Sequence, residues 1–342
     1  MDKLRDLARI NISRRAATAG LLSMAVPVQL GAATGAQGAA AKAGVAPLVL
    51  SCAKMAVETG PLRVAMRNLY GDAAVILNGG AIDLVGKNRK ADLGSNGETQ
   101  MMRHSVAEPG IRVIMTVAEG HYPVIGRRSA GISTLADLKG KRVLCYRHTT
   151  AGFFLHKMLK TVGLSFADVT IVETPLGEVG KVVANREVDA IAIWEPDSEQ
   201  ALHALRAIGE DVVIFSGANV YHERYNLYST ADALANPARR AEIVRFMREV
   251  IRVTEGINTD PAVAAEAQEM VAVSGGLYTP VEVAAGWPNV KFVANFDDRL
   301  LDVFTEEEAW LAPEEKRKPR SREQLARLID KSAYEEAKAA QG

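Results

Sequence analysis

Polar side chains cluster in loop 146–152, directly before a helical pattern, and could bind a small solute there. The loop reads YRHTTAG and presents His148, Thr149 and Thr150. The N-terminus of a helix attracts anions because it has free backbone N–H groups and a favourable dipole, and His148 could donate to a carboxylate or sulfonate. Two alternatives stay open: His148 could be an ordinary surface residue, and the threonines could cap the helix.

Further candidates lie at a second helix N-terminus, at two predicted strand ends and in the polar, aromatic segment 217–226. Trp194 could stack on an apolar part of a ligand or fill the core. Glu58 and Glu195 argue against a site selective only for anions, since they could accept a hydrogen bond from an amine or be neutralised by an arginine. These ligand-binding candidates are Glu58, Thr59, Asn96, Glu98, Trp194, Glu195 and Tyr225.

Catalysis, cofactors and metals find no support in the sequence. It lacks a Gly-x-Ser-x-Gly elbow, a phosphate-binding P-loop, a dinucleotide fingerprint and clustered Cys/His spacing. Glu306–Glu308 are expected on a solvated helix face, and Cys52 and Cys145 are expected to be buried thiols rather than a disulfide. The net charge is zero, from 41 basic and 41 acidic residues, which gives no support to nucleic-acid binding. We therefore predict no catalytic residue, metal, cofactor or nucleic-acid partner.

Strands and helices alternate in two similar series, and these elements must position the candidate residues. Such alternation predicts right-handed βαβ crossovers, and hence an α/β fold with two lobes, each a mostly parallel sheet flanked by helices. Ligands of such sheets bind at the carboxyl ends of the strands. The predicted strands are 47–52, 74–77 and 91–96 in the first series, and 142–145, 169–172 and 189–194 in the second.

The order of these elements predicts the domain boundaries. Residues 44–125 and 226–342 are assigned to lobe one, and residues 126–225 to lobe two. A strand near 122–126 carries the chain into lobe two, and segment 217–226 carries it back. Beyond Asn236–Pro237, a helix start with an N-cap and an N1 proline, the pattern is helical. These C-terminal helices are predicted to pack on lobe one.

The first 43 residues have the composition of an export signal. Arg14 and Arg15 precede an uncharged, mildly apolar stretch, Ala16–Ala41, that ends in small residues. The paired arginines indicate the twin-arginine route, and therefore a periplasmic protein. A membrane helix or a disordered tail is the alternative, and the Gly- and Ala-rich composition weighs against a membrane anchor.

Several short motifs together resemble one family, the periplasmic substrate-binding proteins of ABC importers of the nitrate/sulfonate/taurine (SsuA/ThiY-like) type. The resemblance covers about residues 47–335. Two features depart from the family pattern: Asn78–Lys90 is short, and Arg147–Thr150 replaces a small Gly/Ser-rich loop. The motifs that carry the resemblance are Asp137–Lys141, Gly163–Leu164, Val188–Ala190, Trp194–Pro196 and Asn236–Pro237.

This resemblance implies a type II periplasmic-binding-protein fold and a monomer that closes on a small-molecule solute and delivers it to an ABC transporter permease. The expected solute is an organic anion such as a sulfonate, carboxylate or aromatic acid, with pyrimidine-like precursors as the second choice. The alternative is an enzyme on the same two-lobe fold, of the pyrimidine- or menaquinone-precursor biosynthesis type. Cys145 and His148 would be its plausible catalytic pair.

Overall fold

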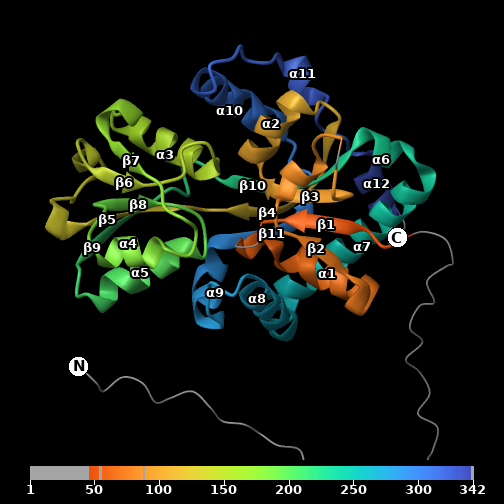
Figure 1. Cartoon of the computed structure of the whole chain (residues 1–342), viewed down its shortest axis with the longest axis horizontal. Coiled ribbons are helices and arrows are strands. Elements are labelled where there is room, and N and C mark those ends of the chain that lie inside the picture. The colour runs from red at the N-terminus through yellow and green to blue at the C-terminus, as the bar shows by residue number, and fades with distance from the viewer. Residues whose placement is uncertain (1–45, 54–55, 88, 340–342) are drawn as a thin grey trace, which may run out of the picture. The chain divides into compact units, whose positions relative to one another are not determined.

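Two β-sheets, joined by two crossovers, organise the chain (Figure 1). The structure is a computed structural model and describes residues 46–53, 56–87 and 89–339. The predicted export signal, residues 1–43, lies outside the described residues. The first sheet has the order β11-β4-β10-β3-β1-β2, with β1 Val49–Cys52, β2 Val75–Leu77, β3 Leu93–Gly97, β4 Ile111–Gly120, β10 Glu223–Thr230 and β11 Val290–Asn295. The second has the order β7-β6-β8-β5-β9, with β5 Pro123–Arg127, β6 Arg142–Leu144, β7 Thr170–Val172, β8 Ala190–Ala192 and β9 Val212–Ser216.

The predicted α/β fold with two lobes is confirmed, and both of its sheets are mixed. β1 pairs in parallel with β2 and β3, and β6 pairs in parallel with β7 and β8. These pairings come from the alternating strand–helix segments, as expected. β5 and β10 enter their sheets directly from the crossovers, without a helix, and run antiparallel to their neighbours.

The helices cover both faces of the two sheets (Figure 1). No helix within the described residues is both long enough and apolar enough to cross a membrane. The α-helices are α1 Gly60–Tyr70, α2 Glu98–Ala107, α3 Thr150–Thr161, α4 Val179–Ala184, α5 Asp197–Ala207, α6 Ala231–Ala235, α7 Pro237–Thr259, α8 Pro261–Gly275, α9 Pro280–Gly286, α10 Leu300–Glu314, α11 Arg322–Ala326 and α12 Ser332–Ala339. The 3-10 helices that the site uses are η1 Val57–Thr59 and η7 Trp287–Asn289.

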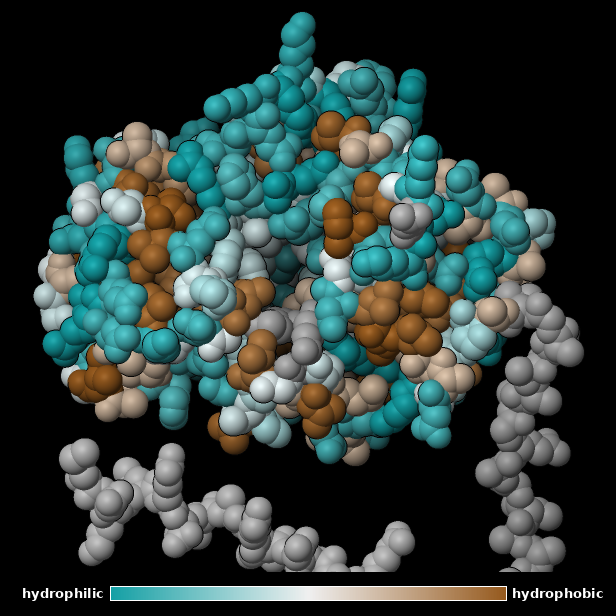
Figure 2. All heavy atoms as spheres, viewed as in Figure 1, coloured by the Kyte–Doolittle hydropathy of each residue, from teal (hydrophilic) through white to brown (hydrophobic). Residues whose placement is uncertain are grey.

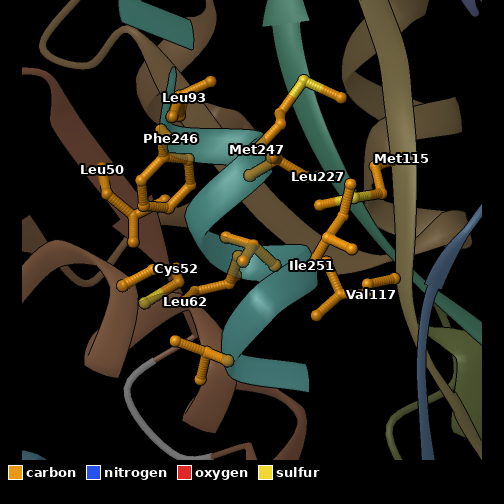
Figure 3. Close-up of a cluster of buried hydrophobic side chains, with 14 of the residues drawn as sticks. Leu50, Cys52, Leu62, Leu93, Met115, Val117, Leu227, Phe246, Met247 and Ile251 are labelled. Carbon is orange, nitrogen blue, oxygen red and sulfur yellow. The ribbon is translucent and has the colours of Figure 1, made fainter. Parts of the chain in front are cut away.

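One hydrophobic core lies between the first sheet, α1 and α7 (Figure 3). Helix α7 begins where Asn236 Oδ1 accepts a hydrogen bond from Arg239 N at 3.1 Å, with Pro237 next in the chain. Its buried residues recur at helical spacing and turn Phe246, Met247 and Ile251 onto the sheet. The C-terminal helix α7 therefore packs on lobe one as predicted, and it supports the strand ends from which the site is built.

One strand contradicts the expectation that the chain is helical beyond residue 236. β11 adds an edge to the first sheet by pairing antiparallel with β4. Its sequence, VKFVAN, is short and follows Trp287–Pro288, so it carries little periodic signal of its own. The pairing with β4, rather than local propensity, determines its conformation.

The two crossovers between the sheets lie side by side. His121 and Tyr122 join β4 to β5, and residues 217–222 join β9 to β10. The rings of His121 and His222 meet edge to face, with centroids 4.5 Å apart. Gly217 N donates to Tyr122 O at 3.3 Å. The two sheets are therefore connected at one place by two adjacent segments.

Candidate functional site

A pocket of about 490 Å³ lies where the strand ends of the two sheets face each other. Residues that follow β1, β2 and β3 line one side, and residues that follow β6, β7 and β8 line the other. Figure 2 shows a hollow near the centre of this face, between the two lobes. The pocket falls within the usual size range of small-molecule sites, about 300–1,000 Å³, and at the strand ends where such folds bind ligands.

Six of the ten predicted ligand-binding residues line this pocket, and four do not. The six are Glu58, Asn96, Thr149, Thr150, Trp194 and Tyr225. Lining residues that the sequence analysis did not select include Tyr146, Gln100, His104 and Glu223. A role in ligand binding remains a prediction for all ten.

The four other candidates are engaged elsewhere. Thr59 Oγ1 donates to Ala56 O at 2.8 Å and accepts from Arg63 Nε at 2.9 Å. His148 contributes its backbone oxygen, which accepts from Gln100 Nε2 at 3.2 Å, rather than a ring in the pocket.

Glu98 and Glu195 turn their carboxyl groups to other elements. Glu98 Oε2 accepts from Arg224 N at 2.9 Å, and its Oε1 accepts from the Tyr221 hydroxyl. Glu195 Oε1 accepts from Asn289 Nδ2 at 2.8 Å. These contacts belong to the surroundings of the pocket.

Glu58 and Glu223, here called the carboxyl pair, bring two acidic groups together in the pocket lining. Glu58 lies in η1 directly after β1, and Glu223 begins β10. They are only 1% and 4% exposed. A Cβ atom on Gly120 would lie 3.2 Å from Glu58 Oε1 and 3.1 Å from Glu223 Oε2. The two carboxyl groups therefore flank the same backbone position.

Protonation of the carboxyl pair follows from this burial. Burial raises the pKa of Glu58 to about 7. Burial, reinforced by the charge of Glu58, raises the pKa of Glu223 well above its ordinary value. Adjacent carboxylates repel each other in a low-dielectric site, so the pair retains a proton near neutral pH. The pair can therefore accept hydrogen bonds from a ligand, and it can release its proton when a positively charged group binds to it.

Residues from both lobes hold Glu223 in place. Thr150, the first residue of α3, donates from Oγ1 to Glu223 Oε1 at 3.3 Å, and its hydroxyl also meets that of Tyr122 at 3.1 Å. Gly97 allows this approach, because a methyl group there would collide with both Glu223 and Thr150. The sequence does contain a signal for Glu223, since residues two apart on a strand share a face and Tyr225 was selected.

Three more buried carboxyl groups neighbour the carboxyl pair. The negative charge of Glu195 helps to raise the pKa of Glu58. Glu223 has the same effect on Glu98, and Glu98 has it on Glu307. Burial raises the pKa of Glu195 to about 7 and that of Glu98 to about 8, and it raises that of Glu307 well above its ordinary value. Within the described ranges, no arginine, lysine or histidine forms an ion pair with any of these five carboxyl groups.

The expectation of a solvated helix face at Glu306–Glu308 is wrong for two of the three residues. Glu307 and Glu308 are 0% and 1% exposed. Glu307 accepts a hydrogen bond from Thr99 Oγ1. Although burial alone would raise it, hydrogen bonds from Arg317 and Arg320 lower the pKa of Glu308 to about 2. The chain thus supplies arginines to Glu308 but not to its neighbour Glu307, because α10 presents them to different surroundings.

Aromatic side chains form another part of the pocket lining. The rings of Tyr146 and Trp194 are 5.3 Å apart between centroids, with their planes inclined by 31°. Tyr146 is fixed by its hydroxyl, which donates to Thr174 O at 2.6 Å. Tyr225 approaches from the first sheet, and its hydroxyl lies 3.2 Å from Ser95 Oγ. A planar apolar group could stack against such rings.

Contacts between the lobes border the pocket on two sides, near α2, α3 and α10 and near α5 and α9 (Figure 1). On the first side, Arg147 Nε donates to Glu314 Oε2 at 2.7 Å. On the second, Asn289 Nδ2 donates to Glu195 Oε1, as described above. The lobes therefore meet around the pocket, so a ligand within it would be held by both.

The proposed catalytic pair of the enzyme alternative does not form a reactive centre here. Cys145 is fully buried, as predicted for both cysteines, and does not line the pocket. Burial raises the pKa of the Cys145 thiol, which disfavours the nucleophilic thiolate. In the part of the chain that the structure describes, no group of His, Cys, Asp or Glu is arranged to hold a metal ion.

Solved structures with this fold include binding proteins and an enzyme. The alkanesulfonate-binding protein SsuA from Xanthomonas axonopodis pv. citri, bound to MOPS, matches with a TM-score of 0.64 and 16% identity over 84% of this chain and 99% of its own. The periplasmic nitrate-binding protein NrtA from Synechocystis PCC 6803 matches with a TM-score of 0.63 and 11% identity over 86% and 89%. The desulfurization enzyme DSZB matches with a TM-score of 0.57 and 16% identity over 86% and 100%.

At such identities these likenesses demonstrate a shared fold alone. No curated protein sequence matches this chain significantly. A family profile described as NMT1/THI5 like matches residues 77–264, which is more than half of the chain. Together with SsuA and NrtA, it confirms the resemblance to sulfonate- and nitrate-type binding proteins. The chain therefore belongs to the NMT1/THI5-like family.

Proposed function

We propose that the chain is the solute-binding component of an ABC importer, which captures a small organic solute between its lobes and delivers it to a membrane permease. The observation that carries this proposal is a pocket lined by both lobes and bordered by contacts between them. A ligand that touches both lobes stabilises the closed arrangement over any open one, and a permease can recognise that difference. The names of SsuA and NrtA support the same reading.

The proposal includes the setting in which the chain works. Residues 1–43 would direct export through the twin-arginine route to the periplasm, where the lobes 44–125 with 226–342 and 126–225 act as a monomer. Replacing Arg14 and Arg15 together by lysine should leave the full chain inside the cell at its precursor length. Arg9→Lys is the matched control, and normal export of the double variant would refute this route.

The chemical class of the solute is a separate question. The N-terminus of α3 at Thr149 and Thr150, and the anions bound by SsuA and NrtA according to their names, support a sulfonate or carboxylate. The lining residues that the structure describes include no arginine or lysine, which weighs against an anion.

A thermal-shift panel tests the proposal. The purified chain is melted with sulfonates, nitrate, aliphatic and aromatic carboxylates, pyrimidines and amines. Binding to the folded state adds about 2.7 kcal/mol at a hundredfold excess over Kd. One class of hits, recovered unchanged, is the expected result. Trp194→Ala should remove the shift, and Val273→Ala, an exposed apolar residue in α8, should not. Consumption of the ligand would instead indicate an enzyme, as DSZB is.

A further inference from the structure

The charge of the pocket lining points to the class of solute. We infer that the pocket binds an organic cation with N–H donors, a protonated amine or an amidinium, seated on the carboxyl pair Glu58 and Glu223. This inference rests on the proposed solute-binding function and names its ligand class. It departs from the anion expected from the sequence.

The carboxyl pair has acceptor atoms that the chain does not satisfy. Glu58 Oε2 and Glu223 Oε2 are buried and accept no hydrogen bond from any N–H or hydroxyl donor among the described residues. The two carboxyl groups lie against each other, and they can hydrogen-bond only when one carries a proton. Buried acceptors without donors are costly, and a ligand that brings N–H groups removes that cost.

Elsewhere the chain supplies its own cations to buried carboxylates. Glu308 receives Arg317 and Arg320, and Glu210 lies within ion-pair distance of Arg127 and Arg186. The described lining of the pocket contains no such partner for the carboxyl pair. A buried carboxyl group is neutralised either by a counter-charge or by a proton, and a cationic solute would take the place of the proton that this pair holds.

The helix N-terminus in the pocket already serves a carboxyl group of the chain. Thr150 opens α3, and its hydroxyl already donates to Glu223 Oε1. The positive end of the α3 dipole therefore faces a carboxyl group that belongs to the chain. An anionic solute would add a further negative charge to an acidic, buried site.

The aromatic part of the lining suits a cation as well. Tyr146, Trp194 and Tyr225 all line the pocket, and aromatic faces attract ammonium and guanidinium-like groups, most strongly at tryptophan. A planar cation could hydrogen-bond to the carboxyl pair while its apolar part lies against Trp194. The raised pKa values fit this picture, because the proton held by the empty pair is released when the cation arrives.

Matched probes of one shape test the inference by isothermal calorimetry on the full chain. Benzamidinium and benzylammonium carry the charge, benzamide is the neutral counterpart, and benzoate and benzenesulfonate are the anions. Each is titrated to about 10 mM, which detects millimolar Kd values. The cations are expected to bind, and benzamide and the two anions to bind at least tenfold more weakly or not at all.

Variants locate the binding on the carboxyl pair. Glu58→Gln and Glu223→Gln should each weaken benzamidinium binding about 10- to 100-fold, the loss typical of a charge-assisted hydrogen bond. Glu307→Gln is the control, because Glu307 is equally buried but does not line the pocket. If a glutamine variant fails to fold, the comparison of benzamidinium with benzamide in the parent chain still tests the inference.

The outcomes separate the inference from the proposed function. If benzoate or benzenesulfonate binds and neither cation does, the inference of a cationic solute is wrong, but the proposed solute-binding function stands. Cation binding that neither glutamine variant weakens also overturns the site. No binding by any probe overturns the inference, while the wider panel decides the function.

Discussion

Replacing Glu195 by glutamine should change how the stability of the chain depends on pH. Glu195 follows β8, is 1% exposed and accepts from Asn289 Nδ2 and Glu199 N. Burial raises its pKa to about 7, against an ordinary value of 4.5. Below its unfolded pKa the carboxyl is protonated in both states, and the folded state is not penalised. Between pH 4.5 and about 7 the unfolded state loses this proton while the folded state keeps it, so stability falls as pH rises, and the loss is complete above about pH 7.

The size of this effect follows from the two pKa values. A rise from 4.5 to about 7 corresponds to about 3 kcal/mol, since each pH unit between folded and unfolded pKa is worth about 1.4 kcal/mol. Glutamine cannot ionise, so Glu195→Gln should gain up to this amount relative to the parent between about pH 5 and pH 8. Glutamine also lacks the second carboxylate oxygen, which accepts from Glu199 N. This loss lowers the free energy of unfolding of the variant by about 1 kcal/mol at every pH.

Urea unfolding of both chains at several pH values measures the difference. The free energy of unfolding of Glu195→Gln minus that of the parent is plotted against pH. Val273→Ala, an exposed position in α8 without an ionisable group, is the control, and its difference from the parent should not vary with pH. A flat line for Glu195→Gln as well would refute the reasoning, because it would mean that Glu195 titrates alike in both states.

Three other outcomes are expected. Benzamidinium affinity should rise with pH between about 5 and 8, by at most tenfold per pH unit for each proton displaced from the carboxyl pair. Calorimetry in two buffers of different ionisation enthalpy detects the released proton. Binding without proton release would count against the carboxyl pair as the site. Gly97→Ala should displace Glu223 and weaken benzamidinium binding more than tenfold, whereas Gly180→Ala, with only ordinary contacts, should not; equal binding by both would contradict the close approach. Arg147→Met removes the ion pair with Glu314 between the lobes. Because this ion pair is partly exposed, ligand affinity should fall only about two- to fivefold, and the loss should be smaller at high salt. A loss that does not depend on salt would point to another cause.

The fold was largely predictable because its strands carry strong local signals. The apolar run at 142–145 and the helical spacing of Phe153 and Leu159 both correspond to elements of the structure, β6 and α3. β11 escaped because its conformation depends on a partner 170 or more residues earlier in the chain, as the pairing of Val290 with Gly120 illustrates. The antiparallel direction of β5 and β10 escaped for the same reason, since strand direction is a property of the sheet.

The sequence located part of the pocket lining, and only Glu58 of the carboxyl pair. Strand-end reasoning located Glu58, Asn96 and Trp194 in the pocket lining. It did not select Glu223, because its segment reads as a polar loop until Glu223 is placed on the same strand as Tyr225. Nor could it foresee Glu307, since three consecutive glutamates favour a solvated face and only the packing of α10 against α2 buries the middle one. Burial of a charged side chain is decided by distant neighbours and leaves little trace in the local sequence.

The neighbouring crossovers at His121 and His222 limit the ways in which the lobes can move. Two widely separated connections would lock the lobes, and a single one would leave them free to turn in every direction. Two adjacent connections can act as a single hinge. Rotation about this hinge strains neither connecting segment, whereas sliding or twisting of the lobes would stretch one of the two segments. The closure proposed for solute capture would therefore follow one arc about these connections.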